Sequence, residues 1–122
     1  DGFDDFAVAG KNGGVEALFV YMGGPSGVGP EPWQVIRSPV PEGNYGFGYS
    51  FGCIGDVNAD GYSDHAVGAG RLGAMGVDYA GGVFIYHGNG DLLPETPSLT
   101  VYNPEPLPEL PGGNFGDAIA VQ

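Results

Sequence analysis

Short apolar runs separated by turns rich in Gly and Pro recur along the whole chain. Runs of four to eight apolar residues, or strict alternation of apolar and polar positions, are typical of strands. The pattern predicts three strands followed by four more, at residues 6–9, 15–21, 33–36, 47–54, 64–69, 83–87 and 99–102. A last strand is predicted at 115–121, after a Pro-rich connection.

Three segments occur twice, in the same order, which indicates an internal repeat. Residues 2–10 resemble residues 61–70, and Asp5 then corresponds to Asp64. The second pair of segments aligns Tyr21 with Tyr86. The third aligns Phe47 with Phe115. The spacing drifts around sixty residues, as expected when loops of different length join strands of similar length.

A repeat of this length with four antiparallel strands predicts an all-β chain of β-propeller blades. A β-sandwich is the main alternative, but it does not require strands to repeat in sequence. The chain holds enough strands for two blades, but it begins with the second strand of one blade and ends with the first strand of another. We expect residues 1–43 to supply strands two to four of a first blade. Residues 44–113 would form a complete second blade with its Pro-rich connection, and 114–122 the first strand of a following blade.

Composition narrows the possible classes further. The 25 Gly and 11 Pro among 122 residues argue against long helices, whereas 42% hydrophobic residues argue against disorder. Three Lys and Arg against 15 Asp and Glu give a formal net charge of −12. This charge disfavours nucleic acid and anionic membranes as partners. No apolar run is long enough for membrane insertion. The excess of carboxylates favours hard cations, or simply solubility.

The segment 56–64 has the spacing of a calcium-binding loop. Calcium prefers six to eight oxygen ligands, which alternate residues of a tight loop can supply. The candidate ligands, at positions 1, 3, 5, 7 and 9, are Asp56, Asn58, Asp60, the carbonyl of Tyr62, and Asp64. Gly61 at position 6 allows the sharp turn. An EF-hand would need a carboxylate at position 12, where this chain has Val67. The alternative without a metal is a polar turn.

The N-terminus carries the second half of another such loop. Asp1, Phe3 and Asp5 correspond to Asp60, Tyr62 and Asp64, and the first half is missing. We expect Asp1 and Asp5 to hold calcium weakly unless a neighbouring chain completes the site.

Other candidate chemistry is sparse. The single cysteine, Cys53, excludes an internal disulfide and is expected to be a small buried residue. His65 is interpreted as a packing residue rather than a ligand. Trp33 is interpreted as packing between blades, with a sugar-stacking platform as the alternative. No Gly-x-Ser-x-Gly motif of a serine hydrolase occurs. A pair of carboxylates for glycoside hydrolysis is not excluded by the sequence.

The chain resembles the FG-GAP repeats of integrin α-subunit propellers and their bacterial relatives. The resemblance rests on residues 47–50, 55–64, 66–69 and 81–86. It implies calcium ligation by the loop residues named above and an extracellular or cell-surface location. It also implies a role in adhesion or binding without catalysis. Here Gly70 stands where the family usually has Pro. Family propellers have about six or seven blades, so further blades are expected from a longer chain or from homo-oligomeric copies.

The leading hypothesis is therefore a non-catalytic, calcium-binding extracellular propeller that binds a protein or glycan ligand, as yet unknown, or a surface. One alternative is a carbohydrate-binding lectin, with pockets between blades lined by Trp33 or Tyr49. Another is the accessory propeller of a larger secreted enzyme, whose catalytic part would lie elsewhere.

Overall fold

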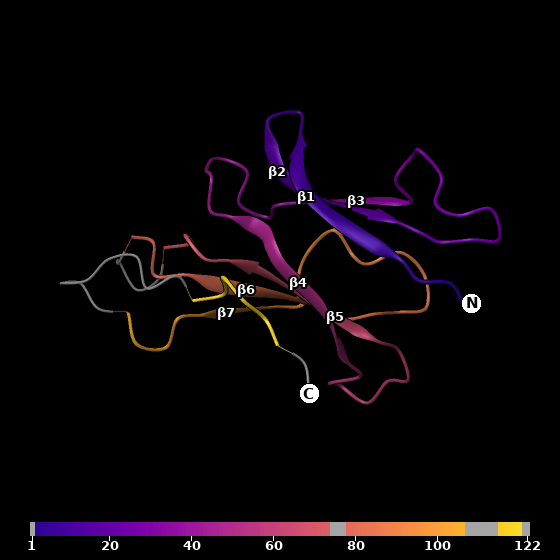
Figure 1. Ribbon diagram of the computed structural model, residues 1–122. Coiled ribbons are helices and arrows are strands. Elements are labelled where there is room, and N and C mark those ends of the chain that lie inside the picture. The colour runs from indigo at the N-terminus through magenta and orange to yellow at the C-terminus, as the bar shows by residue number, and fades with distance from the viewer. Residues whose placement is uncertain (1, 74–77, 107–114, 121–122) are drawn as a thin grey trace.

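The computed structural model describes residues 2–73, 78–106 and 115–120, which form two antiparallel sheets (Figure 1). The first sheet has the order β1-β2-β3, and the second has the order β4-β5-β6-β7. The strands are β1 (Phe6–Asn12), β2 (Val15–Tyr21), β3 (Gln34–Arg37), β4 (Phe47–Gly55), β5 (Asp64–Ala69), β6 (Gly82–Tyr86) and β7 (Leu99–Tyr102). The predicted all-β class is confirmed. Within the described ranges, no helix is long and apolar enough to cross a membrane.

The first sheet begins with a tight hairpin whose geometry is dictated by two glycines. Asn12 pairs with Val15, which leaves only Gly13 and Gly14 in the loop. Both have positive φ, at 60° and 83°. Two-residue hairpins favour this conformation because its twist matches that of the strands, and glycine adopts it without steric cost.

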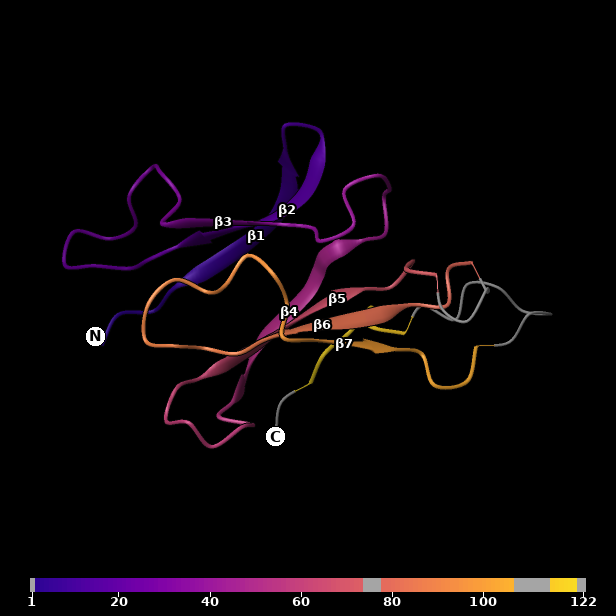
Figure 2. The same ribbon diagram turned by 180° about the vertical axis from the view of Figure 1, so that it is seen from behind.

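The two sheets correspond strand by strand, as the sequence repeat predicts. The pairing of Phe6 with Tyr21 in the first sheet matches the pairing of His65 with Tyr86 in the second. The second sheet has one additional strand, β4, which lies against the first sheet and contacts both β1 and β2. Figure 2 shows the same arrangement from behind, with β4 next to the first sheet.

The hydrophobic core lies between the two sheets rather than inside either one. Leu18 and Ile36 of the first sheet belong to the same buried cluster as Phe47, Val67 and other residues of the second. The second-sheet members also include Phe84, whose ring lies 5.8 Å from that of Phe47. A single sheet of this size has no buried interior, so each depends on its neighbour for most of its apolar burial.

A buried carboxylate fastens the sheets together at one end of this core. Glu16, on β2, is only 6% exposed. Its oxygens accept hydrogen bonds from the backbone amides of Tyr45 (2.8 Å), Gly46 (2.9 Å) and Phe47 (3.3 Å), at the entry to β4. Hydrogen bonds to a charged acceptor are stronger than neutral ones, and three converging donors fix both the position and the direction of the entering strand.

The start of β4 also approaches the first sheet very closely. A Cβ atom on Gly48, whose φ is +86°, would lie 3.3 Å from the Cβ of Ala9 and 3.4 Å from Leu18. The pairing of β4 with β5 shifts register between Phe47 and Phe51, next to this glycine. Gly48 therefore allows both the bulge and the close contact between the sheets.

The tail repeats this contact on the second sheet. Phe115 forms a parallel bridge with Gly81, and the carbonyl of Gly116 accepts a hydrogen bond from Ser50 Oγ at 2.5 Å. Gly116 has a φ of +96° and lies against Val83 and Gly68, the repeat equivalents of Leu18 and Ala9. Beyond Phe115, residues 116–120 form no strand, so the assignment of 114–122 to a following blade stays a prediction.

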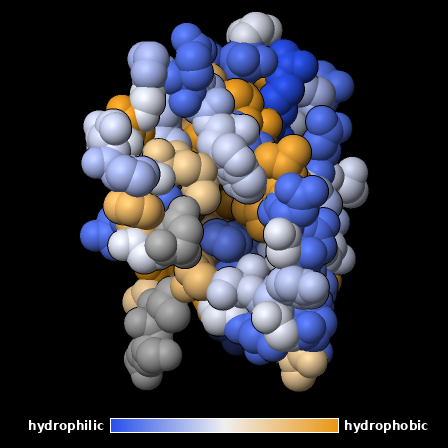
Figure 3. Space-filling view, turned by 90° about the vertical axis from the view of Figure 1, so that its right-hand side faces the viewer, coloured by the Kyte–Doolittle hydropathy of each residue, from blue (hydrophilic) through white to orange (hydrophobic). Residues whose placement is uncertain are grey.

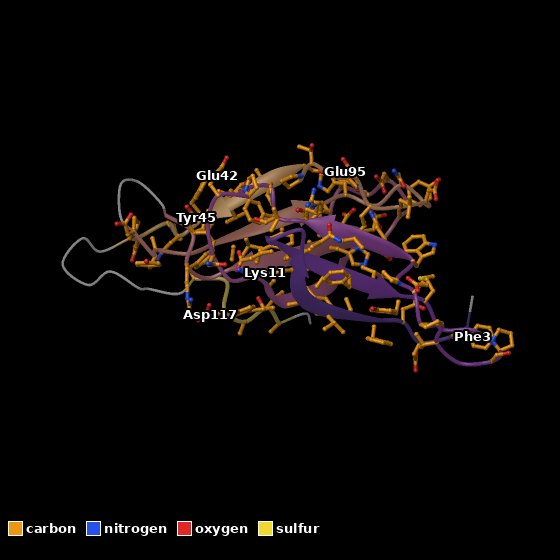
Figure 4. All side chains as sticks on the ribbon, turned by 90° about the horizontal axis from the view of Figure 1, so that it is seen from above. Phe3, Lys11, Glu42, Tyr45, Glu95 and Asp117 are labelled. Carbon is orange, nitrogen blue, oxygen red and sulfur yellow. The ribbon has the colours of Figure 1, made fainter. Side chains whose placement is uncertain are left out.

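We predict that Glu16→Ala lowers the free energy of unfolding by about 3 kcal/mol, because three largely buried amides lose their acceptor at once. Urea denaturation of the protein and the variant measures this difference. Glu42, an exposed carboxylate three residues before Tyr45, provides the matched control (Figure 4). Glu42→Ala should change stability by no more than about 0.5 kcal/mol. Equal effects of the two substitutions would show that Glu16 does not join the sheets.

Candidate metal centre and the adjoining cleft

The candidate calcium loop connects β4 to β5 at one end of the second sheet, as predicted. Gly61 has a φ of +92°, and Ala59 has a φ of +60°. A positive φ is strained for alanine, and such strain persists only where the surrounding structure enforces it. The sequence prediction included the turn at Gly61 but missed the strain at Ala59.

The side chains in the first half of the loop fold back onto its own backbone. Asp56 accepts the amides of Asp60 (2.9 Å) and Gly61 (2.8 Å). Asp60 accepts the amide of Tyr62 at 2.9 Å and the Asn58 side-chain amide at 2.8 Å. These bonds wrap the loop around its polar groups, as Asx turns do.

Asp64 closes the loop and is fully buried as the first residue of β5. Its carboxylate accepts the amides of Val57 (2.8 Å) and Gly88 (2.9 Å). Burial raises the pKa of Asp64. The hydrogen bonds from these two amides, the electrostatic effect of His87 and a further hydrogen bond from the amide of Asn58 together lower it by more. The pKa is therefore lowered. Asp64 is held ionised and ties together the loop, β5 and the segment that follows β6.

The donor set of the loop fits calcium, although its carboxylates are not gathered into a cluster. Within the described residues, no three His, Cys, Asp or Glu side chains converge as they would around a metal. Each ionised carboxylate offers about four lone-pair sites, so one that accepts two amides keeps capacity for a cation. The oxygens of Asp56, Asn58 and Asp60 stand at alternate positions of a single tight turn, and all are hard donors.

The N-terminal half-loop repeats the closing part of this arrangement. Asp5 Oδ1 accepts the amide of Gly23 at 2.8 Å, just as Asp64 Oδ1 accepts that of Gly88. Phe3 is 44% exposed, at the opposite end of the molecule from Tyr45 and Asp117 (Figure 4). Asp1, the remaining predicted ligand, lies outside the described residues. The structure thus shows one closing carboxylate in each unit.

Two glycines that the sequence prediction missed make this closure possible. A Cβ on Gly88 would collide with the carbonyl oxygen of Ser63, and one on Gly23 would collide with that of Asp4. Gly23 and Gly88 both stand two residues after the tyrosines that align in the repeat. This shared position is a signal that the sequence carries.

A cleft of about 560 Å³ opens between the two sheets beside the loop. One wall comes from the first sheet and from Trp33, which precedes β3. The other comes from β4 and β5 and includes Phe51 and Cys53. Tyr62 of the loop and residues within the segment 88–93, which follows β6, also line the cleft. Figure 3 shows this end of the molecule, with hydrophobic residues in the middle of the face and hydrophilic ones around them.

The cleft corrects two predictions. Trp33 was expected to pack between blades, but it is 45% exposed. Cys53 was expected to be buried, but it is exposed. The reason is the same for both residues: the sheets pack tightly near Phe47 and separate toward the loop, so side chains at that end face an open space.

Two buried polar atoms on paired residues have no hydrogen-bond partner within the described part of the chain. They are Nδ1 of His65 and the hydroxyl of Tyr86, on facing positions of β5 and β6. Burial lowers the pKa of His65, partly offset by the charge of Asp64, and burial raises the pKa of Tyr86. His65 is half-buried and lines the cleft, consistent with its interpretation as a packing residue.

Comparison with known proteins agrees with this architecture. Residues 47–86 match the FG-GAP repeat model. Integrin alpha-IIb of Mus musculus is 40% identical over 72 residues, and that of Homo sapiens is 39% identical over the same length. Integrin alpha-PS5 of Drosophila melanogaster is 34% identical over 73 residues. Each match covers 57% of this chain and 7% of the relative, so the chain spans only a small part of these proteins.

The two sheets are therefore blades of the β-propeller class, and residues 47–86 are an FG-GAP repeat. The chain is similar to integrin α-subunits over about 70 residues. The resemblance predicted from the motifs is confirmed.

We predict that Gly88→Ala destabilises the protein by about 1–3 kcal/mol, because the added methyl group meets backbone rather than a movable side chain. Thermal or urea unfolding gives the difference. Gly29→Ala is the matched control, since a Cβ there meets no atom within 4 Å and its φ is not in the left-handed region. If both substitutions are neutral, Gly88 does not close the loop in the way described.

Proposed function

We propose that this chain is part of a calcium-stabilised extracellular β-propeller that binds a protein or a surface and has no catalytic role. The observation that carries the proposal is the loop 56–64 between two paired strands of an FG-GAP repeat. Its oxygen-bearing residues have the spacing that calcium requires. The relatives are integrin α-subunits, which supports a role in adhesion.

Asp56, Asn58, Asp60, the carbonyl of Tyr62, and Asp64 would hold the calcium ion. Bound calcium would supply positive charge that offsets repulsion among the three carboxylates. The chain itself contributes a preformed turn, because the amides of Asp60, Gly61 and Tyr62 already hold the side chains of the loop. The N-terminal half-loop with Asp1, Phe3 and Asp5 would need ligands from elsewhere to form an equivalent site.

Matched exposures support the presence of further blades. Val67 on β5 is 1% exposed because the first sheet covers it. Val8 is its repeat equivalent on β1, and it is 48% exposed. We infer that a preceding blade covers Val8, and that a following blade continues from the Phe115 contact. These blades would come from a longer chain or from further copies.

We predict that saturating calcium raises the melting temperature and that EDTA reverses the effect. Binding to the folded state at 100 times the Kd adds about 2.7 kcal/mol, which corresponds to a shift on the order of 10 °C for a chain of this length. Differential scanning calorimetry in calcium and in EDTA measures it.

Asp60→Asn tests whether the loop is responsible, because it removes a charge but keeps an oxygen for the amide of Tyr62. The shift should then largely disappear. Asp78→Asn removes the same charge outside the loop and should retain the shift. A melting temperature that is unaffected by EDTA in the unsubstituted protein would contradict the metal role.

A further inference from the structure

Each sheet has one face outside the junction, and the repeat relates these outer faces to the two faces that meet inside it. Val67 of the second sheet is buried in the junction, whereas its equivalent on β1, Val8, is half exposed. Ile36 of the first sheet is 1% exposed in the junction, whereas its equivalent on β7, Val101, is 37% exposed. The outer faces therefore present apolar residues at the positions that are buried where two such sheets pack.

Strand pairing places Val8 and Val101 on these outer faces. Val8 pairs with Phe19, which is next to Leu18 of the junction. Val101 pairs with the residue that precedes Phe84, another member of the junction. Because successive side chains of a strand point to opposite faces, Val8 and Val101 point away from the junction. The outer face of the first sheet, with Val8, is here called the front face, and that of the second sheet, with Val101, the rear face.

The first sheet also lacks a strand that the second sheet has. β4 pairs with β5, whereas β1, the equivalent of β5, pairs only with β2 among the described residues. An unpaired strand edge exposes N–H and C=O groups that can pair with another strand. The repeat equivalent of β4 is the tail, whose residues 116–120 form no strand. The chain thus holds both an open strand edge and an unpaired segment that corresponds to the missing strand.

The repeat also sets the register in which this edge and this segment would pair. Phe51 of β4 pairs with Val67 of β5, and their equivalents are Ile119 and Val8, which are also apolar. The tail is kept from β1 of its own chain, because Gly116 lies against the rear face and the second sheet stands in between. Figure 1 shows the first sheet and the C-terminal end on opposite sides of the second sheet. The partner of each must therefore come from outside this part of the chain.

We propose that copies of this chain associate head to tail. The rear face of one copy packs on the front face of the next, and residues 116–120 of the first copy pair with β1 of the second. A second copy fits because the chain carries both halves of the contact, and the junction inside the chain shows how such halves pack. Contacts of this kind close into rings or continue as filaments. A propeller of about four to eight blades corresponds to two to four copies.

The inference rests on the proposed function only in that further blades cover the outer faces, and it names copies of the same chain as their source. The mass in solution reports self-association, whereas the melting temperature in calcium and in EDTA reports the metal role. Either proposal can therefore fail while the other holds.

Sedimentation equilibrium of the 122-residue chain gives the mass, and we expect a multiple of the 12.5 kDa of one chain. Val8→Asp and Val101→Asp each place a carboxylate in the proposed apolar contact and should weaken association by at least about tenfold. Val28→Asp is the matched control, because Val28 is about as exposed as Val8 but lies in the loop between β2 and β3. A mass of one chain at every concentration, or equal effects of all three substitutions, would overturn the proposal.

Mixing the two face variants tests the head-to-tail arrangement itself. Alone, each variant should stay monomeric. In the mixture, the intact rear face of the Val8→Asp chain meets the intact front face of the Val101→Asp chain, so a dimer of twice the mass of one chain should form. A dimer formed by either variant alone would show that a face pairs with itself, which contradicts the proposal.

A disulfide cross-link tests the strand pairing and does not depend on the face variants. Val8→Cys and Ile119→Cys are combined with Cys53→Ala, which removes the exposed native thiol. On oxidation we expect covalently linked multimers on a non-reducing gel. Replacing Val8→Cys by Val28→Cys is the control and should leave single chains. Multimers in equal amount from both pairs, or from neither, would show that the tail does not pair with β1 of another copy.

Discussion

The junction between the two blades depends on the carboxylate of Glu16, which belongs to one sheet and binds the backbone of the other. Neither sheet has a core of its own, so the apolar residues of each are buried only if the sheets meet in one register. Three amides converging on one buried anion specify that register in a way that apolar contact alone does not. Gly48 then permits the close approach that Glu16 directs.

A contact of the same kind forms between the tail and the second sheet, but without a carboxylate. In the second blade, the repeat equivalent of Glu16 is Gly81, and it meets Phe115 through backbone rather than through a side chain. Gly116 occupies the place of Gly48. The contact between blades is thus specified by backbone shape and the Phe-Gly pair. At the first junction the carboxylate of Glu16 adds hydrogen bonds, whereas the second junction has Gly81 at the equivalent position.

The two ends of the junction between the sheets differ in how closely they pack. Near Glu16 the sheets are packed closely, and near the candidate metal loop they separate to leave the cleft. Asp64 and Asp5 hold this open end in shape by binding the amides of Gly88 and Gly23. The loop that would hold calcium is therefore also one edge of the space where Trp33 and Tyr62 are exposed.

Most strands could be predicted from the sequence, because alternation and glycine turns act locally. The predicted strand at 64–69 matches β5, and the strand predicted at 33–36 is shifted by one residue. The role of Glu16, the exposure of Cys53 and the cleft at Trp33 could not be predicted. Each is set by how two units meet, and that contact joins residues that are distant in the sequence, as Glu16 and Tyr45 are. Gly88 could have been found from the repeat, since Gly23 stands at the equivalent position.

Terbium luminescence tests the central claim, a cation held by the loop 56–64, most directly. Terbium is a hard cation that takes oxygen ligands as calcium does, and Tyr62 lies within the loop to transfer excitation energy to it. The account predicts luminescence on excitation of tyrosine, displacement of that signal by calcium, and its loss in Asp60→Asn. Absence of luminescence in the unsubstituted protein, or a signal that calcium does not displace, would contradict the account.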